Sequence, residues 1–506
     1  MPGLTLFLSN RMELLAELLS DVLKSPLNHP LASEVILVQS KGMERWLSMK
    51  LAQRHGICAN VRFPYPIHFV HTLFREINPD LPDHSPYEPS IMSWDIMRIL
   101  PSFLDNPHFQ VIKSYLEGGE YDLKQFQLSV RVADLFDQYL LFRPDMILRW
   151  DRGLEDHWQA ILWRELVREK GPIHRAALHD RFLQVMGDSE IRLRTIPERI
   201  SIFGISALPP FYIEILRALS SVIDVNLFLM NPCREFWGDI VSDREMSRYI
   251  ARRKKKDAFP GELHLEAGNR LLASMGALGR EFFHMIGEIE CAEVSEFFDP
   301  GEGSLLATIQ SDILNLRQRG NTGHLPSLAT DDSLKVHSCH SPLREIEVLQ
   351  DALLAFFHEN PLVHPSDVLV MIPDIERYAP FIQAVFSIPS DDSRWLPFTI
   401  ADRGILHESG LIDTFFKLLD LAGSRFGASE VIDILETAAV RSKFFLAEED
   451  LVLIHHWVRE TGIRWGIDGQ SKGAFDLPSY PWNTWRAGLD RLLLGYAMTQ
   501  SFEDEL

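Results

Sequence analysis

Short apolar runs alternate with amphipathic segments at the start of the chain. Residues 4–8 form a short apolar run compatible with a strand, and leucine and valine then recur at helical spacing over 15–23. The same order repeats, with an apolar run at 35–38, helical spacing over 43–51 and a third strand-like run at 57–61. Continuous apolar strands joined by helices are typical of a parallel sheet covered on both faces. The pattern therefore predicts an α/β fold, which binds ligands at the carboxyl ends of its strands.

Strand patterns disappear between about residues 86 and 194, where long amphipathic helices follow one another. One of these helices is predicted over 126–140. Sheet-like runs return at 199–204 and 224–230, and a helix is predicted to begin near Pro209 between them. We therefore expect a helical subdomain inserted into the first α/β lobe.

A further set of patterns follows the polar stretch 319–332. Strand-like runs at 334–337 and 368–372 flank a helical pattern over 343–357, which predicts a second α/β lobe. Two such lobes suggest a helicase-like framework, although kinases, dehydrogenases and synthetases share this coarse pattern. The expected division is a first lobe over 1–330 (α/β core 1–85 and 195–330, helical insertion about 86–194), a second lobe over 331–430, and the start of a truncated helical insertion over 431–506.

Composition narrows the class of protein. The 506 residues correspond to three or four domains at about 150 residues each, which excludes a peptide hormone or a single small binding module. Lys and Arg number 50 against 71 Asp and Glu, a net charge of −21 that repels phosphate polymers at long range. Any contact with nucleic acid must therefore be a local basic groove.

Cysteine usage and hydropathy bear on the compartment. The four cysteines show no metal-ligand or redox spacing, and so few in a long chain favour a reduced cytosol. No apolar run is long enough to span a bilayer, and the first residues lack the pattern of a signal peptide. We expect a cytoplasmic protein without a membrane partner.

A helicase-like fold is expected to hydrolyse ATP, but the sequence motifs that bind ATP and magnesium are missing. A phosphate loop needs glycines that let the backbone approach phosphate and a lysine that meets its charge. The first strand is followed instead by Ser9-Asn10-Arg11-Met12-Glu13. The strand ending at Phe203 leads into Gly204-Ile205-Ser206 rather than an acidic pair for magnesium. We therefore expect that this chain does not hydrolyse ATP.

Other candidate motifs have ordinary structural interpretations. His337-Ser338-Cys339-His340 resembles a metal or thiol site, but alternate strand residues face opposite ways, so packing is the preferred interpretation. Glu448-Glu449-Asp450 fits a solvated helix N-terminus better than a metal site. The basic run Arg252 to Lys256 is equally a phosphate contact or an exposed loop.

A polar turn at the end of the second strand is a candidate ligand contact. Gln39, Ser40 and Lys41, with Arg45 one helical turn on, place amide, hydroxyl and cationic donors where an open sheet presents its binding crevice. A polar loop that merely covers the core is the alternative interpretation.

Longer blocks of sequence are distributed over the whole chain. They are Val38-Gln39-Ser40, Gly42-Met43, Trp46-Leu47, Phe63-Pro64, 133–140, Arg143-Pro144-Asp145, 204–210, 231–234, 237–240, 271–274, 339–342, 380–386, 462–468 and 494–498. These blocks resemble the RecC family, the gamma chains of bacterial exodeoxyribonuclease V. Blocks this long and in this order are more specific than any short motif.

This resemblance implies a superfamily 1 helicase fold with a degenerate ATP site. In the family the subunit is a non-catalytic scaffold that guides separated DNA strands and scans one of them for the recombination hotspot called Chi during double-strand-break repair. ATP hydrolysis with magnesium and DNA cleavage belong to the partner subunits RecB and RecD. The implied partners are thus RecB, RecD, and single- and double-stranded DNA, with no cofactor bound by this chain.

The resemblance also implies which residues read Chi. Amide and guanidinium groups pair with base edges, carboxylates accept from exocyclic amines, and leucine presses on a base face. Four further positions depart from enterobacterial members, since two cations and two changed stacking partners stand there. We therefore expect a different or more loosely read hotspot. The family positions are Gln39, Asp134, Leu135, Asp137, Arg143 and Arg175, and the departures are Lys41, Arg45, Tyr65 and His71.

Length is a second departure from the family. Family members continue for roughly as many residues again, so the sequence is expected to be a fragment, a frameshifted reading frame or one product of a split gene. Two alternatives to the scaffold role remain. The first is an autonomous superfamily 1 helicase, which the missing phosphate loop argues against. The second is a truncated product that binds RecB or nothing.

Overall fold

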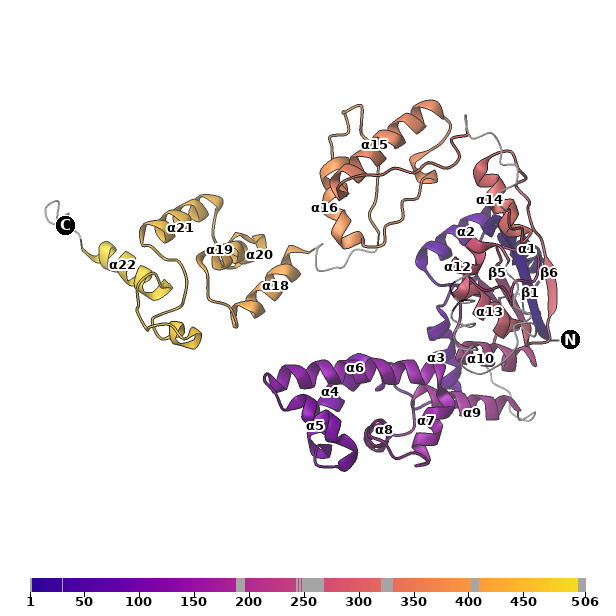
Figure 1. The fold of residues 1–506 in the computed structure, drawn as a ribbon, viewed down its shortest axis with the longest axis horizontal. Helices are drawn as coiled ribbons and strands as arrows, with labels where there is room; N and C mark the ends of the chain where they lie inside the picture. Colours follow the sequence, from indigo (N-terminus) through magenta and orange to yellow (C-terminus); the bar gives the residue numbers. More distant parts are fainter. Residues whose placement is uncertain are drawn as a thin grey trace. The chain divides into compact units, whose positions relative to one another are not determined.

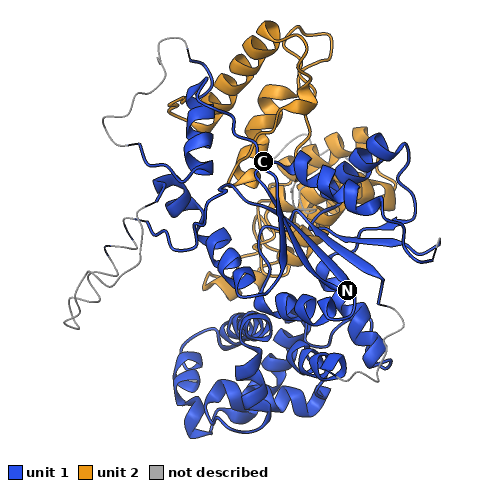
Figure 2. Cartoon of the chain, turned by 90° about the vertical axis from the view of Figure 1, so that its right-hand side faces the viewer, with its two compact units in different colours: residues 1–334 blue, residues 335–506 orange. Residues whose placement is uncertain are grey.

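The computed structural model describes residues 2–29, 31–187, 196–242, 244, 247, 268–319, 331–401 and 409–498. The chain divides into two compact units, Met1–Leu334 and Lys335–Leu506, which Figure 2 colours blue and orange. The lobe and insertion boundaries expected from the sequence stay a prediction, because compactness alone does not define evolutionary domains.

Unit 1 is built on one parallel sheet, which confirms the α/β class (Figure 1). Every strand pair is parallel, and the strand order is β3-β2-β4-β5-β1-β6. Parallel neighbours require crossover connections, which the intervening helices supply. The strands are β1 (Gly3–Ser9), β2 (Glu34–Leu37), β3 (Val61–Arg62), β4 (Arg199–Phe203), β5 (Asp224–Met230) and β6 (Ala292–Ser295).

Helices cover both faces of this sheet, as its continuous apolar strands predict. Alternate residues of β1 point to opposite faces: Leu6 and Leu8 belong to one buried cluster and Phe7 to another. The ring of Phe7 stacks on that of Phe228 from β5, with centroids 4.4 Å apart. The flanking helices are α1 (Met12–Leu23), α2 (Lys41–His55), α3 (Pro66–Ile77), α10 (Pro210–Ser220) and α13 (Ala277–Gly287). Helices α12 (Arg270–Met275) and α14 (Leu305–Leu314) contribute to a separate small cluster.

The inserted segment is helical and has a core of its own. Its largest fully buried side chains are aromatic, among them Trp150, Trp163 and Phe136. The Trp163 indole N–H donates to Asp151, which also accepts from the buried ring of His174. The helices are α4 (Pro89–Ile99), α5 (Gln110–Leu116), α6 (Tyr121–Phe142), α7 (Pro144–Asp151), α8 (Trp158–Lys170) and α9 (Arg175–Gly187), with two short 3-10 helices, η1 (Leu100–Phe103) and η2 (Pro107–Phe109).

Unit 2 contains helices but no strand within its described residues. The strands predicted at 334–337 and 368–372 are therefore wrong as hydrogen-bonded strands. Both segments lack a neighbouring strand to complete a ladder, and a strand is stable only when its backbone groups are paired. The helices are α15 (Pro342–Glu359), α16 (Ile375–Phe386), α18 (Gly410–Leu421), α19 (Ala428–Glu436), α20 (Ala438–Phe444), α21 (Glu448–Glu460) and α22 (Trp485–Ala497), with η5 (Pro365–Asp367) and η6 (Ser471–Phe475).

Two strands of unit 1 also differ from the prediction. The run at 57–61 pairs only from Val61 onward, because Gly56 and Asn60 adopt left-handed backbone conformations at φ 82° and 57°. The Asn60 side-chain amide donates to the carbonyls of Leu31 and Ala32, which fixes this turn. Strand β6 was not predicted, since its four exposed residues lack the apolar pattern of a buried strand.

Candidate functional site

The polar turn after β2 lies at the carboxyl edge of the sheet, as expected. Ser40 is the N-cap of α2 and accepts a hydrogen bond from the Met43 backbone N–H at 3.1 Å. This cap sets the direction of the first helical turn, and the side chains of Gln39, Lys41 and Arg45 are all exposed there. The turn is therefore free to contact a ligand from solvent.

Tyr65 is brought to the same edge by a backbone contact. The Val38 N–H donates to the Pro64 carbonyl at 3.3 Å, so the chain before α3 runs beside the end of β2. Tyr65 is the residue preceding Pro66 at the helix start, and its half-buried ring lies 5.7 Å from that of His68. The structure thus places Tyr65 near the polar turn, although the two are separated in sequence.

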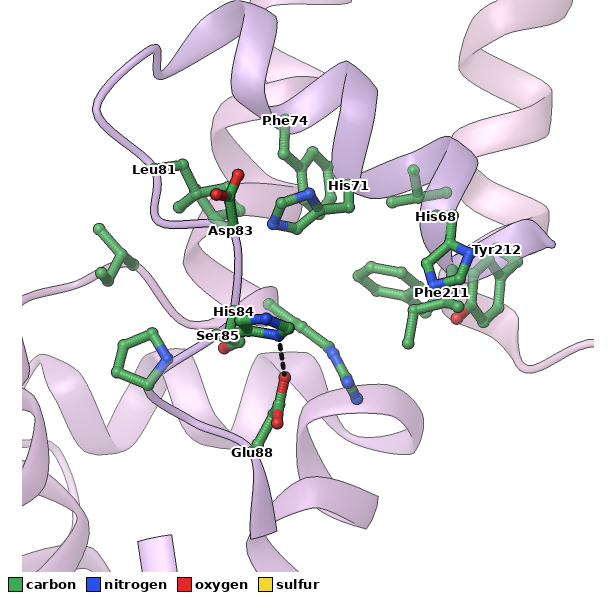
Figure 3. A pocket seen from close by; sticks show the side chains of 16 residues that line it. His68, His71, Phe74, Leu81, Asp83, His84, Ser85, Glu88, Phe211 and Tyr212 are labelled. Carbon is green, nitrogen blue, oxygen red and sulfur yellow. Dashed lines mark ion pairs between the residues drawn. The ribbon is translucent and has the colours of Figure 1, made fainter. Parts of the chain in front are cut away.

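A cavity of about 210 Å³ opens farther along α3 (Figure 3). It contains two of the predicted positions, His71 and Arg175, on helices α3 and α9. Apolar and aromatic side chains line it together with convergent polar groups, a composition typical of small-molecule sites. The lining residues are Ile67, His68, Val70, His71, Phe74, Leu81, Asp83, His84, Ser85, Pro86, Glu88, Ile173, Arg175, Leu178, Phe211 and Tyr212.

His71 has an unusual environment in this cavity. Burial lowers the pKa of its imidazole below the ordinary value, and the nearby Arg75 acts in the same direction, while a backbone hydrogen bond at Pro82 and the charge of Asp83 oppose it. Its Nε2 atom is buried without a hydrogen-bond partner in the described part of the chain. A neutral imidazole with one unpaired nitrogen has the capacity to bond a polar ligand atom.

Asp137 and Arg175 form an ion pair that joins α6 to α9. Their Oδ1 and Nη1 atoms are 2.7 Å apart, and both side chains are largely buried. Burial raises the pKa of the Asp137 carboxyl, Arg175 acts in the opposite direction, and the charge of Asp134 adds to the rise. Burial also raises the pKa of Tyr212, which lies within electrostatic range of the pair. The cation of Arg175 is thereby held at the wall of the cavity.

The other predicted residues of the insertion lie along or just beyond α6. Asp134 is half-buried one helical turn before Asp137, and Leu135 is exposed. Arg143 ends the helix and is exposed. Within the described ranges, no hydrogen bond or ion pair connects Asp134, Leu135 or Arg143 to the polar turn after β2. The structure therefore places His71 and Arg175 in the lining of one cavity and pairs Arg175 with Asp137. The remaining predicted positions lie apart from this group.

Sequence reasoning missed six polar residues of the cavity. His84 and Glu88 approach within 3.9 Å as a potential ion pair, and His68 and Tyr212 face the same space (Figure 3). The spacing of three between His68 and His71 was a usable signal, since it places both rings on one helical face. The other two, Asp83 and Ser85, follow α3 in a loop, and no local pattern indicates their positions.

The remaining candidate motifs are not assembled into sites. Among the described residues, no cluster of His, Cys, Asp and Glu has metal-binding geometry, and no helix has the length and apolarity to cross a membrane. Glu448-Glu449-Asp450 forms the first turn of α21, as predicted, where Asp450 accepts from the Ala447 N–H. Neither Cys339 nor its flanking histidines belongs to a buried core cluster, and Cys339 itself is half-buried. The basic run Arg252 to Lys256 lies outside the described residues.

The ends of strands β1 and β4 are filled by the protein's own side chains. Asn10 exchanges two hydrogen bonds with the backbone of Phe298, at 2.8 and 3.0 Å, and the Arg11 guanidinium carbon lies 3.8 Å from the centre of the Phe298 ring. Gly204 turns at φ 68°, and a Cβ added there would meet the end of the Met43 side chain at 3.1 Å. These turns therefore carry packing contacts.

The fold and the cavity define the class of this protein. It is a parallel α/β protein with an inserted helical segment, and its polar cavity lies where this segment meets the helices of the sheet. Comparison with models of protein families identifies the family within this class. The RecC N-terminal domain matches residues 4–316, and the fourth domain of the RecBCD enzyme subunit RecC matches residues 408–506. The chain belongs to the RecC family.

Curated relatives match nearly the whole chain. The RecBCD enzyme subunit RecC of Escherichia coli K12 is 38% identical, that of Haemophilus influenzae 36% and that of Mycolicibacterium smegmatis 35%. Each alignment covers 98% of this chain but only 46–48% of the relative. The chain thus spans about half the length of the relatives that it matches.

Proposed function

We propose that this chain is a non-catalytic, DNA-binding part of an exodeoxyribonuclease V complex, in which it guides unwound strands and reads Chi during recombinational repair. Its relatives are named as subunits of the RecBCD enzyme, so the proposed protein partners are RecB and RecD. ATP and magnesium would be used by those partners, and the proposed compartment is the cytoplasm.

The observation that carries this proposal is the partly buried Asp137–Arg175 pair, whose Arg175 lines a cavity that also contains His71. A carboxylate repels phosphate, so its presence beside a DNA path favours contact with base edges over contact with the backbone. Arg175 supplies donors, His71 a buried nitrogen, and the nearby rings a surface for stacking. Such groups distinguish bases in single-stranded nucleic acid.

The polar turn after β2 complements this cavity. Lys41 and Arg45 are exposed cations at the start of α2, and Tyr65 is a half-buried aromatic residue at the same edge of the sheet. Cations neutralise phosphates and aromatic rings stack on bases, which are the two components of single-strand binding. Since these residues and His71 differ from those expected in enterobacterial members, the hotspot that is read should differ too.

The proposed loss of ATP binding is supported by the contacts at β1 and β4. A phosphate loop needs free backbone N–H groups and close backbone approach. Here the Asn10 side chain and the Phe298 backbone are bonded to each other, and methionine side chains lie against Gly204. A superfamily 1 helicase-like framework without this site would hold DNA passively.

A binding experiment tests the proposed interface. Single-stranded DNA affinity should fall steeply with salt, and Tyr65→Ala should weaken it by about tenfold or more, because stacking on one aromatic ring contributes about 1–3 kcal/mol per base. Tyr121→Ala is the matched control, since Tyr121 is exposed on α6 outside the proposed path. Equal losses in both variants, or no DNA binding, would contradict the proposal.

Chi reading is tested in the assembled complex. The chain co-expressed with RecB and RecD is expected to protect one strand downstream of a hotspot other than the enterobacterial octamer, and His71→Ala should change the preferred sequence. Full attenuation at the enterobacterial octamer would contradict altered reading. DNA-stimulated ATPase activity of the purified chain would favour the autonomous helicase, and co-purification with RecB without DNA binding would favour the partner-binding fragment.

A further inference from the structure

The imidazole of His71 has one bonded and one unbonded nitrogen. It makes a single backbone hydrogen bond, at Pro82 in the loop that follows α3. Proline has no backbone N–H, so the Pro82 carbonyl must accept this bond and the imidazole must donate it. Because Nε2 is buried without a hydrogen-bond partner among the described residues, the donating atom is Nδ1.

This bond fixes the hydrogen-bonding character of the other nitrogen. Burial lowers the pKa of the His71 imidazole, which favours the neutral ring at neutral pH. A neutral imidazole has one N–H and one lone pair. With the N–H on Nδ1, the lone pair is on Nε2, which can therefore only accept. A ligand that satisfies Nε2 must present a donor to it.

Two charges next to His71 oppose each other. The carboxylate of Asp83 favours a protonated ring, and the cation of Arg75 disfavours it. These two groups are themselves paired, since Arg75 Nη1 and Asp83 Oδ1 are 2.6 Å apart. The pairing leaves burial as the largest influence on the ring, so His71 stays a neutral acceptor.

Arg175 gives the same cavity a group of opposite character. Its Nη1 atom donates to Asp137 at 2.7 Å, and a guanidinium has five N–H donors but no acceptor. The cavity lining therefore combines an acceptor nitrogen on α3 with a donor group on α9. Nucleobases carry donors and acceptors on their edges and can satisfy both kinds of group.

The size and walls of the cavity suit one base. Its volume of about 210 Å³ is below the roughly 300–1,000 Å³ of sites that enclose drug-sized ligands. The rings of His68, Phe211 and Tyr212 also line it (Figure 3). Aromatic side chains stack on unpaired bases, so these rings favour a planar heterocycle as the occupant.

We propose that His71 selects a nucleobase that carries an exocyclic amine, namely adenine, cytosine or guanine, by accepting a hydrogen bond from this amine at Nε2. Thymine has no amine, and its one ring N–H lies between two carbonyls whose lone pairs would face that of Nε2. The proposal rests on the proposed DNA-binding function, because an unpaired base must reach the cavity.

Nitrogen NMR of the full chain with isotope-labelled histidine tests the proposal without DNA. At neutral pH, His71 should be neutral with its proton on Nδ1, and His71→Phe identifies its signals by their loss. Deoxycytidine should shift the Nε2 resonance of His71, whereas thymidine should not. A proton on Nε2, a charged ring, or equal shifts with both nucleosides would overturn the proposal.

Oligonucleotide binding tests selection in a single strand. The full chain should bind oligo(dC) about fivefold or more tightly than oligo(dT) of equal length, because only cytosine can donate to Nε2. His71→Phe keeps an aromatic ring but removes both nitrogens, so it should abolish this preference and retain salt-dependent DNA binding. His108→Phe is the matched control, since His108 is exposed on η2 outside the cavity.

The outcomes separate this proposal from the proposed function. Binding of both oligonucleotides with equal affinity, or a preference that survives in His71→Phe, would overturn the selection by His71 and leave DNA binding intact. A shift of the Nε2 resonance by deoxycytidine without any binding of oligonucleotides would support the base pocket and contradict the proposed DNA-binding function.

Discussion

At the scale of single residues, the charged groups of the candidate site are held by partners far away in sequence. Asp137 and Arg175 are 38 positions apart, and each neutralises the partly buried charge of the other through a direct hydrogen bond. A buried charge without its partner is costly, whereas the intact pair contributes little net stability. The pair is therefore best understood as fixing the position of Arg175 at the cavity.

Arg175→Ala should lower the free energy of unfolding by about 1–3 kcal/mol, because Asp137 is left buried without its hydrogen bond. Chemical denaturation followed by fluorescence measures this change. Arg168→Ala removes an exposed pair with Glu165 and should leave the free energy of unfolding nearly unchanged, because solvent screens that pair. The double variant Asp137→Asn with Arg175→Ala should recover part of the loss, and an additive result would contradict a specific pair.

Asp299 predicts a pH dependence of stability. Hydrogen bonds from the Asn315 side chain and the Gly301 N–H lower the pKa of Asp299 from 3.8 to about 2. Because the folded pKa lies below the unfolded one, this group stabilises the fold above about pH 4 and the contribution disappears as the pH falls toward 2. Asp299→Asn should reduce the loss of stability between pH 5 and 2, measured by thermal unfolding, and an unchanged slope would contradict the assignment.

At the scale of elements, helix ends decide where the candidate side chains point. The cap of α2 is the clearest case, because Ser40 lies between Gln39 and Lys41 and bonds the Met43 N–H. The turn after β4 has no such cap. Its direction depends on Gly204, whose left-handed backbone brings the chain close to the side chains of Met12 and Met43. Local chemistry at strand ends therefore shapes both the proposed DNA edge and the turn after β4.

Ser40→Ala should destabilise the protein by about 0.5–2 kcal/mol through loss of the cap. The effect on unfolding is measured by denaturant titration. Ser274→Ala is the control, because this exposed serine bonds a carbonyl within α12 and caps no helix. If the two variants lose equal stability, the cap has no special role.

At the scale of the whole molecule, the buried cores are unevenly distributed. Four of the five hydrophobic clusters of the described residues lie in unit 1, and unit 2 has a single small one around Ile432, Val458 and Ile463. Since burial of apolar surface is the main stabilising term in folding, unit 1 should be much the more stable.

Residues 1–334 expressed alone should therefore fold and keep the main unfolding transition of the full chain. Unit 2 should unfold at lower denaturant concentration, which circular dichroism of the full chain would detect as an earlier, smaller transition. A fragment 1–334 without a cooperative transition would show that unit 1 depends on unit 2.

Much of unit 1 could be predicted from the sequence, because its signals are local. Apolar runs predicted β1, β2, β4 and β5 to within a residue or two, and helical spacing predicted helices between β3 and β4. Periodicity depends only on neighbouring residues, and the absence of a phosphate loop is likewise a property of short segments. Most candidate residues came from resemblance, and physical chemistry alone would have indicated only the turn at Gln39 to Arg45.

Tertiary structure alone decided the features that join distant segments. It set the strand order, added the unpatterned β6, paired Asp137 with Arg175 and closed a cavity from α3, the following loop, α9 and α10. It also left the apolar runs of unit 2 unpaired, although their pattern resembles that of buried strands. The physical reason is that a sequence pattern specifies which face of a segment seeks burial, while a ladder or a cavity exists only where a second segment supplies the other side.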